Sequence, residues 1–182
     1  MPKIIPSFKI TKPIVLVGLM GAGKTRIGKI LAQILNIPFI DSDMLIQQKT
    51  GLLIKDFFQN YGEKAFREQE QNTIIENLNS INYSIISTGG GAFINPVLRT
   101  VIKTQSCSIW VKANLKITLK RVSWNTKRPL LNNQDNLKKT IIQLRKERYP
   151  FYQEADIIVH NNQTISYAIQ STLYSLDQFF NK

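Results

Sequence analysis

The sequence predicts an α/β domain in which a parallel sheet of five strands is covered by helices on both faces. Three observations lead to this prediction. Short apolar segments alternate along the chain with segments of helical periodicity, which is typical of strands joined by crossover helices. A glycine-rich turn separates the first apolar segment from the first helical one. The chain has 182 residues, which suits one domain, residues 1–182, with a full hydrophobic core.

The first strand and the first helix enclose a phosphate-binding motif. The apolar strand Ile14–Val17 leads into the run Gly18-Leu19-Met20-Gly21-Ala22-Gly23-Lys24-Thr25. This is the pattern G-x-x-x-x-G-K-[ST] between a strand and a helix. Glycines allow backbone N–H groups to surround a phosphate chain, and the start of the helix adds its positive dipole end. We expect Lys24 to reach the β- and γ-phosphates and the Thr25 hydroxyl to bind Mg²⁺. The alternative, a glycine turn with an idle lysine, fits the flanking strand and helix poorly.

The elements that follow alternate in the same way. A helix is predicted over residues 24–35, where apolar side chains recur every three or four positions. Residues 39–40 form a short strand that ends at acidic residues. Helices are predicted over residues 54–58 and 63–78, separated at the Tyr61-Gly62 pair.

The second half of the chain repeats the alternation. Asn95-Pro96 starts a helix, and Pro150 is expected to stop another. The predicted elements are strand 83–87, helix 96–103, strand 108–111, helix 115–122, helix 136–148, strand 157–159 and helix 166–180.

Composition limits the possible classes of protein. The formal charge of +12 is compatible with nucleic-acid binding, but the lysines are scattered and form no basic stripe with aromatic residues. No apolar run approaches the roughly 20 residues of a membrane span. Residues 1–11 are a short mixed leader without a signal-peptide core, so we expect a cytoplasmic protein. The single cysteine, Cys107, precludes an internal disulfide and is expected to be buried in a strand.

Several polar groups stand where the predicted strands end. Asp41 and Asp43 follow the second strand, and ligands bind at that edge of open α/β sheets. One could serve the water shell of a metal and the other an acceptor hydroxyl, and a helix cap together with a solvated surface acid is an equally good interpretation. Arg67 and Glu70 lie on one face of a helix, which on its own describes an ordinary surface ion pair. The three glycines of Gly89–Gly91 are a stronger signal, because a backbone there must lie close to something.

A polar stretch over residues 123–135 has no periodicity and is a candidate mobile lid. Its Arg128 would place a cation over the phosphates, and a solvent-exposed basic loop is the alternative. Arg148, on its own, likewise describes a solvated helix end. The only histidine, His160, has no partner cluster in sequence, so Mg²⁺ is the only metal implied.

Taken together, these residues resemble the shikimate kinase family. The resemblance spans roughly residues 12–160 in a consistent order. It rests on the phosphate motif, Gly28, Leu31-Ala32, Asp41-Ser42-Asp43, Gly62-Glu63, Phe66-Arg67, Glu70, Thr88-Gly89-Gly90-Gly91, Arg128-Pro129-Leu130-Leu131, Arg148 and Ala155-Asp156. The phosphate motif alone matches many kinases, whereas the combination is far more selective. The segment Asn161–Thr164 matches the family only loosely, so no adenine contact is predicted there.

The resemblance implies an activity and a fold. The activity is ATP-dependent phosphorylation of the 3-hydroxyl of shikimate, giving shikimate 3-phosphate and ADP on the route to chorismate and the aromatic amino acids. The fold is the three-layer P-loop kinase fold with strand order 2-3-1-4-5 and a mobile lid. Shikimate and ATP with Mg²⁺ are the implied ligands, bound by a monomer without nucleic-acid or membrane partners. Residues from about 41 to 80 would form the substrate-binding region.

The resemblance also assigns roles to residues. Asp43, Lys24 and Arg128 would be catalytic. Asp41 would contact the outer shell of the Mg²⁺ ion bound by Thr25. Glu70 would orient Arg67. The implied nucleotide contacts are Gly21, Ala22, Gly23, Lys24, Thr25, Arg26, Arg121 near the adenine, and Arg128. The implied shikimate contacts are Asp43, Phe58, Phe66, Arg67, Gly89, Gly90, Gly91 and Arg148.

Three alternatives remain open at this point. Another small-molecule P-loop kinase, such as a gluconate-type kinase, would share the phosphate motif. A nucleic-acid-binding ATPase would account for the charge and would bind nucleic acid in a strongly salt-dependent way. A catalytically silent relative is disfavoured by the intact Lys24, Asp43 and Arg128.

Overall fold

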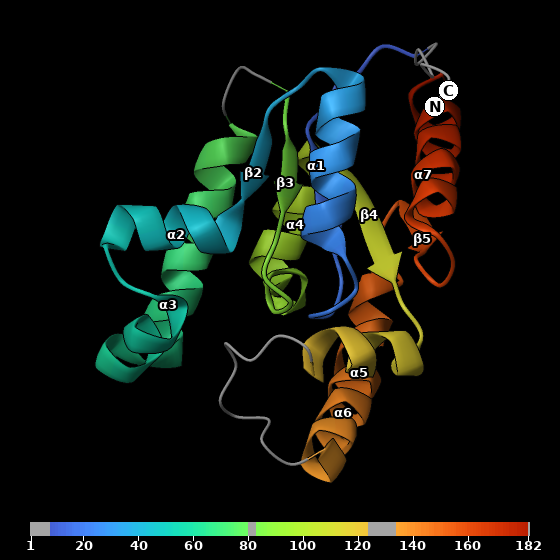
Figure 1. Cartoon of the computed structure of the whole chain (residues 1–182). Coiled ribbons are helices and arrows are strands. Elements are labelled where there is room, and N and C mark those ends of the chain that lie inside the picture. Colours follow the sequence, from blue (N-terminus) through green and yellow to red (C-terminus); the bar gives the residue numbers. More distant parts are fainter. Residues whose placement is uncertain (1–7, 80–82, 124–133, 182) are drawn as a thin grey trace.

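A computed structural model of the chain describes residues 8–79, 83–123 and 134–181. Five parallel strands form one sheet in the order β2-β3-β1-β4-β5, as predicted (Figure 1). The strands are β1 (Ile14–Val17), β2 (Phe39–Asp41), β3 (Ile85–Ser87), β4 (Cys107–Lys112) and β5 (Ile157–His160). Most of the predicted leader, most of the predicted lid, and Arg128 lie outside the described residues.

The register of the central strands brings their carboxyl ends level. Ser87 of β3 pairs with Leu16 of β1 on one side and with Asp41 of β2 on the other. The glycine-rich turn after β1, the acidic residues after β2 and the glycines after β3 therefore meet at one edge of the sheet, as expected for parallel strands.

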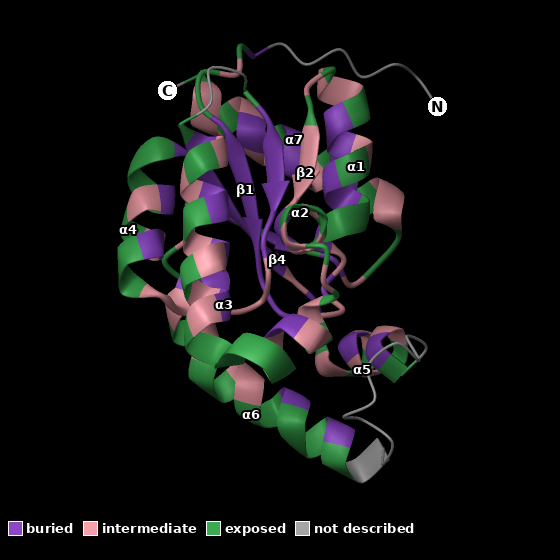
Figure 2. Cartoon of the chain, turned by 90° about the vertical axis from the view of Figure 1, so that its left-hand side faces the viewer, coloured by how far each residue is buried: buried purple, intermediate pink, exposed green. Residues whose placement is uncertain are grey.

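Helices cover both faces of the sheet (Figure 2). They are α1 (Lys24–Leu35), α2 (Ser42–Thr50), α3 (Ile54–Leu78), α4 (Pro96–Gln105), α5 (Leu115–Ser123), α6 (Gln134–Tyr152) and α7 (Ile165–Phe180), with a 3₁₀ turn η1 (Ala92–Ile94) before α4. Helices α1 and α7 lie on one face, and α3 and α4 lie on the other (Figure 2). Among the described residues, no helix combines the length and the apolar character that crossing a membrane requires.

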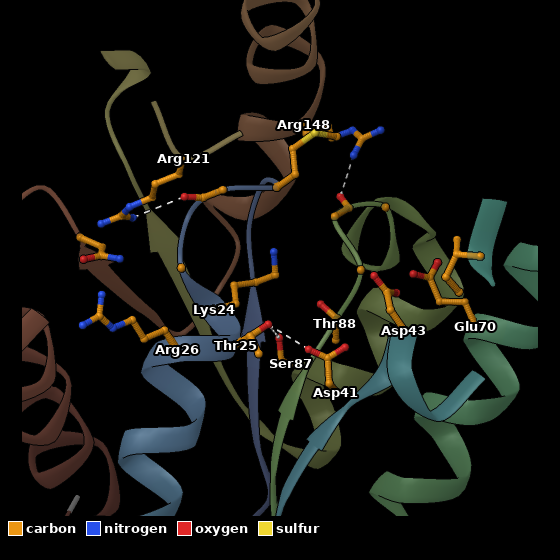
Figure 3. A pocket seen from close by; sticks show the side chains of 18 of the residues that line it. Lys24, Thr25, Arg26, Asp41, Asp43, Glu70, Ser87, Thr88, Arg121 and Arg148 are labelled. Atoms are coloured by element: carbon orange, nitrogen blue, oxygen red, sulfur yellow. Dashed lines mark hydrogen bonds between the residues drawn. The ribbon is translucent and has the colours of Figure 1, made fainter. Parts of the chain in front are cut away.

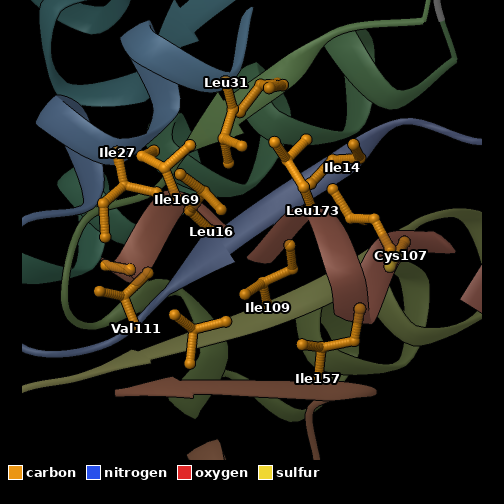
Figure 4. Packing of buried hydrophobic residues seen from close by; sticks show 14 of the residues in the cluster. Ile14, Leu16, Ile27, Leu31, Cys107, Ile109, Val111, Ile157, Ile169 and Leu173 are labelled. Atoms are coloured by element: carbon orange, nitrogen blue, oxygen red, sulfur yellow. The ribbon is translucent and has the colours of Figure 1, made fainter. Parts of the chain in front are cut away.

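The three central strands β3, β1 and β4 are buried on both sides, and their successive residues point to opposite faces and so contribute to two cores. One core contains Leu16 and Ile109 packed against Leu31 of α1 and Leu173 of α7 (Figure 4). The other contains Val15, Val17, Ile86 and Trp110 packed against Ile74, Leu98, Ile102 and Tyr152. Cys107 is buried in β4 as predicted, and its burial raises the pKa of the thiol.

The two helices predicted over residues 54–58 and 63–78 are present as the two parts of α3, which is kinked where Gly62 adopts φ 78° and ψ 174°, so the predicted break at Tyr61-Gly62 is confirmed. The predicted stop at Pro150 is wrong, because α6 continues through Pro150 to Tyr152.

The continuation of α6 has a visible physical reason. Pro150 removes one backbone donor, but aromatic packing holds the last turn in place. The ring of Trp110 lies 4.8 Å from Tyr149 and 5.8 Å from Tyr152, measured between centroids. Tyr152 is thereby placed one helical turn after Arg148, on the same face of α6.

The described end of the predicted leader contacts the body of the domain. Phe8 is buried, and its ring stacks on Phe180 at the end of α7 with 5.7 Å between centroids.

Candidate active site

The turn between β1 and α1 is shaped by glycines in left-handed conformations. Gly21 has φ 74° and Gly23 has φ 100°, which residues with a Cβ rarely adopt. Helix α1 begins directly after Gly23, at Lys24. The N–H groups and the dipole at the start of that helix therefore face the turn, which is the arrangement that binds phosphate.

Lys24 and Thr25 begin α1 beneath this turn. The Lys24 ammonium donates to the carbonyls of Gly18 at 2.7 Å and Leu19 at 3.1 Å. The Thr25 hydroxyl donates to Asp41 Oδ2 at 2.9 Å and lies 3.5 Å from the Ser87 hydroxyl. Three oxygen groups thus gather at the ends of three neighbouring elements. Asp41 also caps α2 by accepting from the Met44 backbone N–H at 3.4 Å, so the helix-cap interpretation of its position is confirmed.

One carbonyl of the phosphate-binding turn, that of Ala22, accepts hydrogen bonds from two side chains that lie outside the turn. Asn161 donates its amide Nδ2 to the Ala22 carbonyl at 2.8 Å, and Arg121 donates Nη1 to the same carbonyl at 3.1 Å. A Cβ on Gly23 would lie 2.5 Å from Asn161 Nδ2, so the packing there requires glycine. Burial, with a smaller effect of neighbouring Arg26, lowers the pKa of Arg121.

Two carboxylates meet across the glycines that follow β3. Asp43 lies in the first turn of α2, and Glu70 is buried in α3. A Cβ on Gly89 would clash with Glu70 Oε1 and would lie 3.0 Å from Asp43 Oδ1. The missing side chain of Gly89 therefore lets both carboxylates approach the loop.

Arg67 is held by carboxylates of its own helix. Its Nη1 donates to Glu70 Oε2 at 2.8 Å, and its Nη2 donates to Glu63 Oε1 at 3.1 Å. Burial lowers the pKa of Arg67, but attraction to Glu70 and Glu63 outweighs burial and raises it overall. Burial raises the pKa of Glu70, and the nearby Arg67 charge only partly offsets this. The surface ion pair considered in the sequence is in fact buried on the Glu70 side, where the side chain is 2% exposed, and partly exposed on the Arg67 side.

A carbonyl in the loop after β3 is also held by two side chains. Arg148 donates Nη1 to the Gly90 carbonyl at 3.0 Å, and Tyr152 donates its hydroxyl to the same oxygen at 2.5 Å. A Cβ on Gly91 would clash with the Arg67 guanidinium. Two arginines from different helices therefore converge on these glycines.

These groups line one cavity of about 1040 Å³. Figure 3 shows Lys24 between Arg121 and Arg26 on one side and Asp43 and Glu70 on the other, with Arg148 at the top of the view. The predicted site residues that line it are Gly21, Gly23, Lys24, Thr25, Arg26, Asp41, Asp43, Phe58, Phe66, Arg67, Glu70, Gly89, Gly90, Gly91, Arg121 and Arg148. Ala22 is buried behind the turn, and its carbonyl takes part as described above. The rings of Phe58 and Phe66 lie 4.5 Å apart.

Some residues of this region were not predicted from the sequence. Asn161, Gln163 and Ile165 line the cavity after β5, in a segment for which no ligand contact was predicted. Their place after the last strand was the available signal, because it put them at the same sheet edge. Tyr152 gave no such signal, since the helix that carries it was expected to end at Arg148.

The cavity can bring together a polyphosphate and a small acid. Its nucleotide half, Gly18–Arg26 with Arg121 and Asn161, offers backbone donors and cations. Its acceptor half, around Asp43, Arg67, Glu70, Gly89–Gly91 and Arg148, offers a carboxylate and two arginines. Phosphoryl transfer requires this kind of positioning and charge neutralisation. The fold and the site together define a P-loop small-molecule kinase.

Comparisons with known proteins identify the family. The family model of shikimate kinase matches residues 20–177. The chain is 39% identical to the shikimate kinase of Bartonella quintana, over 98% of this chain and 89% of that protein. It is 42% identical to the shikimate kinase of Paramagnetospirillum magneticum, over 87% and 80% of the two chains. The chain belongs to the shikimate kinase family, as its sequence motifs predicted.

Solved structures agree with this assignment. Shikimate kinase from Acinetobacter baumannii, solved in complex with shikimate, superposes with a TM-score of 0.82 at 32% identity and covers 98% of this chain and 97% of its own. A gluconokinase from Sinorhizobium meliloti superposes with a TM-score of 0.62 at 17% identity, over 97% and 95% of the two chains. The second similarity is one of fold alone.

Proposed function

We propose that this protein transfers the γ-phosphoryl group of ATP to the 3-hydroxyl of shikimate, producing shikimate 3-phosphate and ADP. The observation that carries the proposal is the shared cavity. A phosphate-binding turn and a pocket with two arginines and a carboxylate open into the same space. A gluconate-type kinase would share the first feature, but membership of the shikimate kinase family favours shikimate over a sugar acid.

Arg67 and Arg148 are suited to the substrate carboxylate. Each is already fixed by a partner in the protein, Arg67 by Glu70 and Arg148 by the Gly90 carbonyl, so little side-chain entropy is lost on binding. Phe58 and Phe66 would border the ring of the substrate, and Gly89–Gly91 would contact it through the backbone.

Asp43 is suited to the acceptor hydroxyl. Its carboxylate would take the hydroxyl proton while that oxygen bonds to the γ-phosphorus, and the bond from phosphorus to the bridging oxygen of ADP breaks. Lys24 and the start of α1 would stabilise the charge that moves onto the phosphates. Arg128, which lies outside the described residues, stays a prediction from the family resemblance.

The residues at Thr25 fit a magnesium ion. Mg²⁺ prefers oxygen ligands and is usually held by one or two carboxylates together with phosphates and waters. Thr25 and Asp41, already 2.9 Å apart, supply such oxygens, with Ser87 beside them. Bound there, Mg²⁺ would neutralise phosphate charge. A monomeric state, a cytoplasmic location and the absence of nucleic-acid binding stay predictions.

An assay of ADP release tests the proposal directly. The purified protein is given ATP and Mg²⁺ with shikimate, with gluconate, or with no acceptor, and the phosphorylated product is identified by mass spectrometry. We expect ADP release that depends on shikimate and a product carrying one added phosphoryl group. Release that is equal without an acceptor, or that responds to gluconate alone, would overturn the proposal.

A further inference from the structure

The two halves of the cavity share one structural feature that the proposed ligand contacts do not explain. In each half, one carbonyl of a glycine-containing loop accepts two side-chain hydrogen bonds. The Ala22 carbonyl accepts from Arg121 and Asn161, and the Gly90 carbonyl accepts from Arg148 and Tyr152. Both lone-pair positions of each carbonyl are therefore used.

The two donors of each pair differ in charge and in exposure. Arg121 and Arg148 are half-exposed cations that line the cavity. Asn161 is 2% exposed and Tyr152 is 0% exposed, and both are uncharged. An arriving anion attracts the arginines and competes for their N–H groups, whereas it exerts far less force on the buried neutral donors. The neutral donors can therefore keep each carbonyl in place when the arginine N–H groups are shared with the ligand.

The direction of a carbonyl fixes the direction of the next N–H group. The described chain contains no cis peptide bonds, and in a trans peptide the C=O and the following N–H point in opposite directions. Holding the Ala22 carbonyl outward thus orients the Gly23 N–H, and holding the Gly90 carbonyl orients the Gly91 N–H. Glycine loops rotate easily at these peptides, so an external restraint has a large effect there.

We infer that Tyr152 and Asn161 are positioning residues, each of which sets the backbone of one glycine-containing loop for one of the two substrates. Tyr152 acts through Gly90 on the acceptor half, and Asn161 acts through Ala22 on the nucleotide half. The inference rests on the proposed function, because it names shikimate and ATP as the two ligands. It predicts that the two residues have separate, crossed effects on binding.

The chain offers a matched control for each residue. Tyr149 also lies on α6, also packs on Trp110, and donates its hydroxyl to a backbone carbonyl, that of Ala113, at 3.4 Å. It does not line the cavity. Asn162 follows Asn161 and uses its Oδ1 to accept from the Asn114 backbone at 2.7 Å, also outside the cavity lining.

The tyrosine experiment compares Tyr152→Phe with Tyr149→Phe. Each variant loses one hydroxyl and keeps its ring. For Tyr152→Phe we expect the KM for shikimate to rise about 3- to 10-fold, the value of one hydrogen bond, while the KM for ATP changes less than about 2-fold. Tyr149→Phe is expected to leave both constants unchanged. Equal changes in both constants, or no change in either, would overturn the role of Tyr152.

The asparagine experiment compares Asn161→Leu with Asn162→Leu. For Asn161→Leu we expect the KM for ATP and the Kd for ADP to rise about 3- to 10-fold, with the KM for shikimate nearly constant. Asn161→Ala repeats the test without apolar bulk beside Gly23, in case the leucine variant folds poorly. A rise in the KM for shikimate equal to that for ATP would overturn the role of Asn161.

The activity of the wild-type protein distinguishes a failure of the proposed function from a failure of the present inference. If wild type fails to phosphorylate shikimate, the proposed function is wrong. If wild type is active but the Tyr152 and Asn161 variants show no crossed pattern, only the present inference is wrong. The thermal unfolding of each variant is measured as well. A variant and its control that are equally destabilised but differ in KM show that the change in KM does not come from lost stability.

Discussion

The two halves of the active-site cavity are assembled in different ways. The nucleotide half is mostly one continuous segment, Gly18–Arg26, whose shape follows from its own glycines and from the start of α1. The acceptor half collects Asp43 from α2, Arg67 and Glu70 from α3, the glycines after β3, and Arg148 from α6. The first half depends on local sequence, and the second depends on long-range packing.

This difference has a chemical counterpart. Backbone N–H groups at a helix start recognise a phosphate chain in general, which suits a cofactor used by many enzymes. Charged side chains fixed by partners recognise one shape and charge pattern, and they reject ligands that leave them unpaired. We therefore expect substitutions in the two halves to affect different kinetic constants.

The largest expected effect is that of Lys24→Met. It removes the cation at the phosphate turn, and we expect kcat to fall by about 10³-fold or more. Shikimate binding should persist, because its contacts come from other elements. Turnover is measured by ADP release and shikimate binding by calorimetry. Turnover near that of wild type would contradict the nucleotide-half assignment, and a loss of shikimate binding would show that the halves are not independent.

The second prediction compares two aspartates that are two residues apart. Asp43→Asn should lower kcat by about 10²- to 10⁴-fold while ATP still binds, because the amide cannot accept the hydroxyl proton. A variant with near-normal turnover would remove Asp43 from the mechanism.

The matched control is Asp41→Asn. Asp41 contacts Thr25 and belongs to the nucleotide half. We expect this variant to need a higher Mg²⁺ concentration for half-maximal activity, with a smaller loss of kcat at saturating Mg²⁺. If Asp41→Asn and Asp43→Asn showed the same Mg²⁺ dependence, Asp41 and Asp43 would not belong to different halves of the cavity.

The third prediction compares Arg148 and Arg121, the arginines that donate to the Gly90 and Ala22 carbonyls. Arg148→Ala should raise the KM for shikimate about 10- to 100-fold, the value of a charged hydrogen bond, and leave the KM for ATP nearly unchanged. Arg121→Ala should show the reverse selectivity. Steady-state titration of each substrate at saturating levels of the other measures both constants, and equal effects on both would count against separate anion sites.

The two halves of the cavity also differ in how far the sequence alone predicted them. The spacing of glycines, Lys24 and Thr25 predicted the nucleotide turn, because local geometry determines that motif. The strand order and the convergence of the two acceptor arginines required the family resemblance, since no spacing rule brings together Arg67 and Arg148, which are 81 positions apart.

The residues that escaped prediction depend on tertiary packing. Tyr152 reaches Gly90 only because α6 continues past Pro150, and that continuation depends on contacts with Trp110 from a distant strand. Asn161 reaches Ala22 from the opposite end of the sequence. A helix-stop rule applied to Pro150 considers the backbone alone, so it could not include the compensating aromatic contacts.

The smallest expected effect concerns the buried partner of Arg67. Because burial raises the pKa of Glu70, this group takes up a proton at a higher pH than an exposed glutamate does. Protonation removes the charge that fixes Arg67, so kcat/KM for shikimate should fall as the pH is lowered through that pKa. At higher pH Glu70 is ionised and the ion pair is intact. Glu70→Gln should lower kcat/KM for shikimate by less than about 10-fold and abolish this acidic limb. The KM for ATP, measured over the same pH range, is the internal control, because Glu70 lies in the acceptor half. An acidic limb that persists in Glu70→Gln would assign the titration to another group, and a limb of equal size in the KM for ATP would place that group outside the acceptor half.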